Sequence, residues 1–238
     1  MSRNTRLALF ACSGATLAAL FVWGLTGLPA FGGFQGEYGQ ILNRVTGQER
    51  HVTNVVAAIV FDYRGFDTLG EEFILFAAVM GVALLLREAR GEGERRVDIV
   101  RSDFVRAVGL ASVGPVVLVG LFTIAHGVLT PGGGFQGGVA TASGLVLLWA
   151  AGRYRAYRRA SPHVLVDFAE GTGAGAYAAV GIAALVAGSA YLTNIVGLGV
   201  TGTLAAGGTI AILNLAAGLE VTAAVVLLCH EFLEELMS

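Results

Sequence analysis

The chain has 238 residues, of which 55% are hydrophobic and only 13% are charged, and its formal net charge is −2. Soluble domains carry about 25% charged residues, so this composition and a mean hydropathy of +0.72 exclude an ordinary soluble protein. A sequence pI of about 6.1 also disfavours nucleic-acid binding. We therefore predict an all-α integral membrane protein with about six transmembrane helices and one short half-inserted or interfacial helix.

The apolar stretches that can cross a bilayer follow from length, since a span needs about 20 residues. In chain order they are residues 7–27, 69–88, 104–126, 134–152, 172–192 and 209–232. The first of them is read as a span and not as a cleaved signal peptide, because it is nearly long enough to cross. Residues 53–60 are also apolar but too few to span, so we predict the half-inserted or interfacial helix there.

A change in composition near residues 91–98 divides the chain, because charged residues replace the apolar ones there. It predicts a two-span module over residues 1–90 and a four-span module over residues 98–238. Each module can represent an ancestral subunit.

Arginine supplies all 15 basic residues and marks one side of the predicted membrane protein. The loops 127–133 and 193–208 contain no arginine. By the positive-inside rule the arginine-bearing segments face the cytoplasm, and both termini are then cytoplasmic. These arginines are Arg3, Arg6, Arg87, Arg90, Arg95, Arg96, Arg101, Arg106, Arg153, Arg155, Arg158 and Arg159.

The run from Pro131 to Gly138 is the most unusual segment, since a proline and five glycines surround one aromatic ring and one amide. Glycine permits sharp turns and close packing, and irregular backbone at a membrane must be buried in protein or lie at the interface. We predict a structural loop on the extracytoplasmic side. It comprises Pro131, Gly132, Gly133, Gly134, Phe135, Gly137 and Gly138.

Two segments of the four-span module carry a resemblance to a known family. Residues 126–138 read His-Gly-Val-Leu-Thr-Pro-Gly-Gly-Gly-Phe-Gln-Gly-Gly, and residues 213–221 read Leu-Asn-Leu-Ala-Ala-Gly-Leu-Glu-Val. This part resembles the B subunit of Mrp-type multisubunit Na+/H+ antiporters. Residues 28–32, 54–56 and 62–71 resemble the E subunit of membrane-bound hydrogenases and the C-terminal end of the Mrp A subunit. The chain thus looks like a fusion of two neighbouring small subunits.

The resemblance implies a transporter subunit of a Na+/H+ antiporter complex related to the membrane arm of respiratory complex I, in the cell membrane of a prokaryote. Its expected partners are the other subunits, the lipid bilayer and Na+ or H+. The first alternative is a membrane-arm subunit of a complex I-like redox enzyme, such as a membrane-bound hydrogenase, with which the chain is also compatible. The second alternative is a structural scaffold without a titrating ion path.

Ionisable side chains at membrane depth cost about 2.5–3.5 kcal/mol on insertion scales, so each is a candidate for function. Glu220 is the only charged residue between Ile210 and Leu228, and it is a candidate for the ion path or its coupling. A buried interhelical hydrogen bond is the structural alternative. His126, at the end of a span, is a candidate proton relay or a cap on the glycine-rich loop.

A dense group of charges precedes the second span. It can attract a cation at the extracytoplasmic mouth, or it can simply be a solvated helix start. Thr68 and Glu71 have the spacing of a capping box, and an aspartate–arginine pair can hold the half-helix against the next span. The candidates in this group are Asp62, Arg64, Asp67, Glu71 and Glu72.

The remaining polar residues predict no soluble enzyme chemistry. Asp167 and Glu170 are expected at a cytoplasmic helix entrance, and Cys12 and Cys229 are isolated within predicted spans. The glycine run does not follow a predicted strand, so it does not favour a dinucleotide site. We expect no catalytic residue, no metal and no cofactor.

Overall fold

The computed structural model describes residues 3–28, 36–89, 102–151 and 154–237, and these residues form helices and connecting loops without a strand. They divide into two compact units, residues 1–41 and 42–238. The predicted all-α membrane class is confirmed.

The first unit contains helix α1 (Arg3–Thr26), and none of its residues is buried. A helix that is apolar on all sides suits lipid or a protein partner. Helix α2 (Glu37–Glu49) begins in the first unit and ends in the second. We did not predict α2, because it is polar and lies between the first apolar stretch and the predicted short helix.

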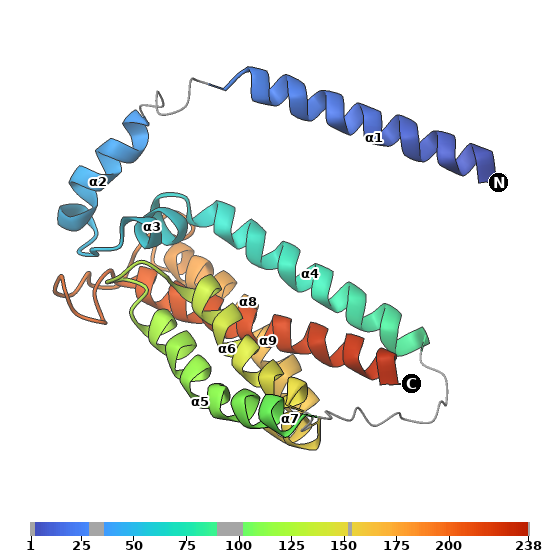
Figure 1. Ribbon diagram of the computed structural model, residues 1–238. Helices are drawn as coiled ribbons and strands as arrows, with labels where there is room; N and C mark the ends of the chain where they lie inside the picture. The colour runs from blue at the N-terminus through green and yellow to red at the C-terminus, as the bar shows by residue number, and fades with distance from the viewer. Residues whose placement is uncertain (1–2, 29–35, 90–101, 152–153, 238) are drawn as a thin grey trace. The chain divides into compact units, whose positions relative to one another are not determined.

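The second unit is a helical bundle, drawn in Figure 1 with its loops gathered at two ends. Helix α9 packs against α4, α6 and α8, while α5 packs against α6. Of the most apolar window of α9, 67% of the residues are buried, against 11% for α5, so α9 is the centre of the bundle. The bundle helices are α4 (Gly65–Ala89), α5 (Asp103–Ala125), α6 (Gly134–Ala150), α8 (His163–Val186) and α9 (Thr209–Met237).

Helices α1, α4, α5, α8 and α9 are long and apolar enough to span a membrane. Helix α6 has 17 residues and is about 25 Å long, slightly shorter than the hydrocarbon core. The predicted bounds 172–192 are wrong, because α8 starts at His163 and ends at Val186. Glu170 lowers the hydropathy of the first turns of α8, although its side chain is buried. At the other end, Gly188, with a φ of 79°, follows the last residue of the helix.

The chain enters α4 through an irregular segment. Helix α3 (Val55–Ala58) continues into a single π-helical turn (Ile59–Tyr63), and α4 follows from Gly65. The predicted short helix is therefore present. The predicted capping box is wrong, because Thr68 lies inside α4 and is only 2% exposed. Asn54 instead caps α3, where its side-chain oxygen accepts from the backbone N–H of Val56 at 3.1 Å.

Two asparagines fix the glycine-rich connection between α5 and α6. Asn54 Nδ2 donates to the carbonyl oxygen of Gly127 at 2.7 Å. Asn214 Nδ2 donates to the carbonyl oxygen of Ile124 at 2.7 Å, and its Oδ1 accepts from the N–H of Gly134 at 2.8 Å. Segments far apart in sequence are therefore joined at the α3 end of the bundle.

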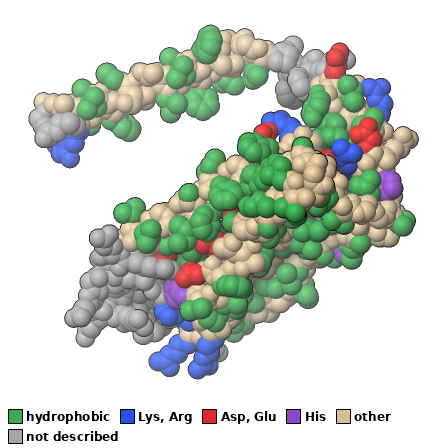
Figure 2. Space-filling view, turned by 180° about the vertical axis from the view of Figure 1, so that it is seen from behind, with side chains coloured by type: hydrophobic (Ala, Val, Ile, Leu, Met, Phe, Trp, Pro, Cys, Tyr) green, Lys and Arg blue, Asp and Glu red, His purple; other side chains and the backbone are tan. Residues whose placement is uncertain are grey.

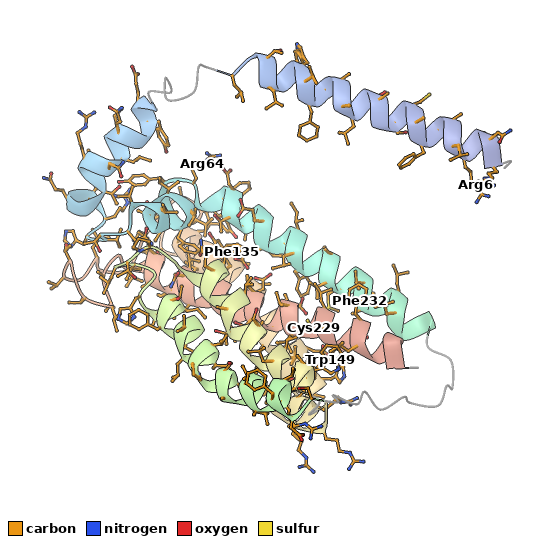
Figure 3. The ribbon with its side chains drawn as sticks, viewed as in Figure 1. Arg6, Arg64, Phe135, Trp149, Cys229 and Phe232 are labelled. Atoms are coloured by element: carbon orange, nitrogen blue, oxygen red, sulfur yellow. The ribbon has the colours of Figure 1, made fainter. Side chains whose placement is uncertain are left out.

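The predicted loop from Pro131 to Gly138 is only partly a loop. Gly132 and Gly133 have φ values of 139°, which favour glycine, but α6 begins at Gly134. Gly134, Phe135, Gly137 and Gly138 thus belong to a helix, with Phe135 visible near its start in Figure 3. A Cβ on Gly138 would lie 2.9 Å from Val221 Cβ, so this glycine lets α6 approach α9.

Candidate functional site

Four glutamates of the bundle are buried, and three of them come from three different helices, while the fourth, Glu231, lies further along α9. Glu72 of α4 and Glu220 of α9 are 0% exposed, and Glu170 of α8 is 1% exposed. Helix α9 packs against both α4 and α8, and α4 also touches α8. Burial of three carboxyl groups is costly unless they are paired or protonated, so this arrangement singles out a candidate functional site.

Apolar residues enclose the three glutamates on both sides along the bundle. Towards α3 lies the outer cluster, defined by Phe61, Tyr177, Leu213 and Ala217 with their neighbours. Towards α7 (Tyr154–Ala160) lies the inner cluster, defined by Val79, Val166, Ala223 and Leu227 with theirs. On each helix the glutamate lies between residues of the outer and inner clusters. The carboxyl groups thus form a polar layer inside an apolar bundle.

Gly173 brings α8 against α9 at the level of this layer. A Cβ added to Gly173 would lie 2.6 Å from Glu220 Cβ and 2.7 Å from its backbone nitrogen. Glu170 precedes Gly173 by three residues, so both lie on the same face of α8. The glycine therefore allows the close helix contact that brings Glu170 near Glu220.

Glu72 and Glu220 interact most closely, and Glu170 adds a weaker electrostatic interaction with Glu220. Within the described part of the chain, the four carboxyl oxygens of Glu72 and Glu220 have no hydrogen-bond partner other than the carboxyl group of the pair itself. Two desolvated carboxyl groups in proximity cannot both carry a negative charge cheaply. If the two carboxyl groups share at least one proton, the electrostatic repulsion between them is removed.

The glutamates are not arranged as ligands around a metal ion. Among the residues that the structure describes, no three His, Cys, Asp or Glu side chains converge as such a site requires. The chemistry that the carboxyl pair fits is the binding and release of protons.

The structure separates the charges that the sequence grouped before the second span. Glu72 points into the bundle, whereas its neighbour Glu71 is exposed. Asp62 pairs with Arg50, with 2.7 Å between Oδ1 and Nε. Arg64 pairs with Asp67 instead, and Figure 3 shows Arg64 at the α3 end of the bundle. We predicted one aspartate–arginine pair here, and the structure has two. One of them involves Arg50, which we did not single out from the sequence.

These ion pairs line a cleft of about 550 Å³ at the α3 end. One wall is residues 62–67, and the other is formed by residues 191–194 with Leu198. Partial burial disfavours the charge of Arg50, but the hydrogen bond and the negative charge of Asp62 outweigh it and raise the pKa of the guanidinium. Burial and a hydrogen bond donated to Glu49 raise the pKa of Tyr63. The cleft is a charged, water-accessible surface, with acidic and basic side chains together at this end of Figure 2.

His126 lies at the C-terminal end of α5, as predicted from the sequence. Its Nδ1 is 3.0 Å from the carbonyl oxygen of Phe122, and its ring stacks on the Phe122 ring with centroids 3.8 Å apart. These contacts stay within its own helix, and they fit a cap at the end of α5. A proton-relay role for His126 stays a prediction.

A second buried polar group lies near α7. His230 of α9 is 1% exposed, and its Nε2 is 2.9 Å from Ser161 Oγ. The rings of Tyr157 and His163 lie 4.7 and 4.4 Å from the His230 ring. The exposed arginines Arg155 and Arg159 lie close to this end in sequence, and arginine side chains mark it in Figure 2.

Sequence reasoning missed two members of the site. It placed Glu170 at a cytoplasmic helix entrance, which is wrong because the residue is buried in α8. It did not single out Tyr177, which is fully buried on the same helix. The small residues between them, Gly173 and Ala174, were the available signal of a close helix contact.

Two family models match the chain. One is described as a domain related to the MnhB subunit of Na+/H+ antiporter and matches residues 104–227. The other describes the E subunit of MBH and matches residues 1–101.

Two relatives share sequence with the chain. A protein of Methanocaldococcus jannaschii, named as uncharacterized, is 29% identical, over 94% of this chain and 95% of its own length. A protein of Rhizobium meliloti, named as the probable A/B subunit of a K+/H+ antiporter, is 31% identical over 126 residues. That match covers 43% of this chain and 13% of the larger protein.

Two solved structures share the fold. A chain of the membrane-bound sulfane sulfur reductase, an archaeal respiratory membrane complex, has a TM-score of 0.74 and 28% identity. The match covers 97% of this chain and 99% of that one. A chain of the Mrp complex from Dietzia sp. DQ12-45-1b has a TM-score of 0.70 and 24% identity, over 98% of this chain and 26% of that one.

Proposed function

Because the chain belongs to the family with a domain related to the MnhB subunit of Na+/H+ antiporters, we propose that it is a membrane subunit of a multisubunit cation/proton antiporter complex. The complex is of the type related to the membrane arm of respiratory complex I. Its partners are other subunits, since both structural relatives are parts of multisubunit membrane complexes. The matches at residues 1–101 and 104–227 support a fusion of two small subunits, with modules 1–90 and 98–238.

The observation that carries a role in ion transport is the carboxyl pair Glu72–Glu220. It is fully buried and lies between two apolar clusters, and beyond each other its carboxyl groups have no hydrogen-bond partner within the described residues. A structural pair would be expected to have further hydrogen-bond partners. We therefore assign the carboxyl pair to proton uptake and release during cation exchange. Glu170 lies close enough to Glu220 to influence the proton affinity of the pair.

The charged cleft at the α3 end supplies the water-facing side of the proposed path. Asp62, Arg64 and Asp67 line the cleft and remain candidates for attracting cations, and Glu71 remains a candidate outside its lining, one turn after Asp67 on α4. Most of these side chains are ion-paired or exposed. We therefore expect them to attract cations through the electrostatic potential of the cleft and not to bind cations directly.

The function is tested on the whole complex, purified through a tag on this chain and reconstituted in vesicles. Addition of Na+ or K+ is expected to dissipate an imposed pH gradient, followed by a pH-sensitive dye. A complex assembled without this chain is the control and is expected to be inactive. A preparation of this chain alone that is homogeneous and exchanges cations for protons would contradict the proposal.

A second candidate is a membrane-arm subunit of a complex I-like redox enzyme. It is favoured by the match over nearly the full length of a chain of the sulfane sulfur reductase. Mass spectrometry of the intact complex and its iron content separate the two candidates. Co-purification of an iron–sulfur subunit in constant stoichiometry would support the redox assembly. The carboxyl pair has the same proton-handling role in both.

Both termini are expected in the cytoplasm, in the cell membrane of a prokaryote, with the α3 end of the bundle outside. Thr130 and Arg159 are exposed, and the arginine-bearing segments are placed inside by the positive-inside rule. With Cys12 and Cys229 replaced by alanine, Thr130→Cys should react with an impermeant maleimide on intact cells. Arg159→Cys should react only after permeabilisation. Reaction of both from the same side would contradict this orientation.

A further inference from the structure

Tyr177 separates the charged cleft from the carboxyl pair. Gly65 lines the cleft, and the Tyr177 hydroxyl donates to the Gly65 carbonyl oxygen at 3.0 Å. The side chain is 0% exposed and packs at a centroid distance of 6.4 Å from the Phe61 ring. The cleft therefore ends at a hydrogen bond between a backbone carbonyl and a buried phenol.

On the side of this hydrogen bond that faces away from the cleft, the next polar groups are those of the carboxyl layer. Tyr177 follows Gly173 by four residues and so lies one turn further out on the same face of α8. Thr68 precedes Glu72 by four residues on α4 and is likewise one turn further out. The Tyr177 hydroxyl interacts with the Thr68 side chain and electrostatically with Glu72. The phenol thus lies between Gly65, which lines the cleft, and the carboxyl layer.

The surroundings of Tyr177 allow its hydroxyl to reach the cleft floor. A Cβ on Gly65 would lie 3.8 Å from that hydroxyl, an ordinary van der Waals distance, so the hydroxyl lies directly beside Gly65. Gly65 also starts α4 directly after the π-helical turn, and such turns recur at functional sites. One buried side chain therefore lies between the cleft residue Gly65 and the carboxyl layer, and its hydroxyl contacts the Gly65 carbonyl oxygen and the Thr68 side chain.

We propose that Tyr177 is the gating residue on the extracytoplasmic side of the path to the carboxyl pair, a role that rests on the proposed function. In the structure the gate is closed, because the ring fills the space between Gly65 and Thr68. Release of the hydrogen bond to Gly65 lets the ring turn and admits water from the cleft. Protons then reach Glu72 along that water, and closure isolates the pair from outside.

The test measures access to the inner side of the gate and does not depend on transport. Thr68 is 2% exposed, so Thr68→Cys places a thiol of similar size directly inside Tyr177. The variant is made in the full complex, with Cys12 and Cys229 replaced by alanine. Its reaction rate with a small, charged, membrane-impermeant thiol reagent is measured from the extracytoplasmic side.

With Tyr177 present the thiol is expected to react slowly. Tyr177→Phe removes the hydrogen bond and keeps the ring, so the rate is expected to rise about fivefold. Tyr177→Ala removes the ring and should raise the rate further. Tyr191→Phe is the matched control, because it removes a tyrosine hydroxyl from a residue that lines the cleft itself, and it should leave the rate unchanged.

Slow reaction in both Tyr177 variants would overturn the gate, and so would fast reaction with Tyr177 in place. If the alanine variant does not assemble, the phenylalanine variant decides alone. In vesicles, Tyr177→Phe should also change the pH profile of exchange, which a purely structural role would not do. Unchanged exchange in a glutamine variant of Glu220, together with faster labelling in Tyr177→Phe, would overturn the proposed function and leave Tyr177 as a water barrier.

Discussion

Replacing Glu220 by glutamine is expected to lower cation/proton exchange by at least about tenfold while the complex stays assembled. Glutamine keeps the size of the side chain but cannot bind and release a proton. Its amide can donate a hydrogen bond to Glu72, whose oxygens have no partner other than Glu220 in the described part of the chain. That bond would hold Glu72 in its ionised form and remove the second proton site as well.

Glu72→Gln is expected to have an effect of similar size, because the two carboxyl groups act as one unit. For the same reason the double variant should be little worse than either single variant. Glu220→Asp should be milder, since it retains a titrating group on a shorter stem. The measurement is the rate at which Na+ or K+ dissipates a pH gradient in vesicles, recorded across the pH range.

Glu71→Gln is the matched control, because Glu71 is the sequence neighbour of Glu72 but is exposed. Its rate of exchange should fall far less than tenfold, because an exposed carboxyl group contributes only to the surface potential. Normal exchange in both Glu72→Gln and Glu220→Gln would favour the scaffold interpretation. Failure of either variant to assemble would instead indicate that the carboxyl pair is structural.

The membrane class and the family were predictable from the sequence because both signals are local. Long apolar runs predict spans wherever they occur. The residues from His126 to Gly138 and from Leu213 to Val221 predicted the family, and the match at residues 104–227 confirms it. The buried position of Glu220 also followed from its apolar neighbours.

The bounds of α8 and the burial of Glu170 were not predictable from hydropathy. A carboxyl group lowers the hydropathy of its window whether it lies in water or inside a bundle. Its burial depends on Gly173, which brings α8 against Glu220, a residue far along the chain. The burial of Glu170 is therefore determined by the packing of α8 on α9 and not by the local sequence.

Glu71 and Glu72 show the same limit within one helix. They are adjacent, so their side chains point about 100° apart, and one is exposed while the other is buried. Helix α4 has exposed phenylalanines, Phe66 and Phe73, on its outer side, so apolar residues do not distinguish its inner face. The direction of Glu72 is fixed by α9. The contact between Tyr177 and Gly65, 112 positions apart, is equally non-local.

Gly173→Ala is expected to reduce the yield of assembled complex and to destabilise the bundle by about 1–3 kcal/mol. The added Cβ would lie 2.6 Å from Glu220 Cβ, 2.7 Å from its backbone nitrogen and 2.8 Å from its Cα. Because backbone atoms cannot move aside as a flexible side chain does, α8 has to shift away from α9. The shift also separates Glu170 from Glu220, so exchange should fall in any complex that still assembles.

Gly171 and Gly175 provide matched controls on the same helix. A Cβ on either meets no atom of this chain within 4 Å. Gly171→Ala and Gly175→Ala should therefore be neutral or stabilise the helix by about 0.5–1 kcal/mol. The readouts are the midpoint of thermal unfolding and the amount of intact complex on a native gel.

A normal midpoint in Gly173→Ala would show that α8 and α9 tolerate a wider separation. Equal damage in all three variants would place a partner subunit against the open side of α8. Damage confined to Gly173→Ala would mean that the contact with Glu220 itself stabilises the assembly, because only that glycine faces the carboxyl layer.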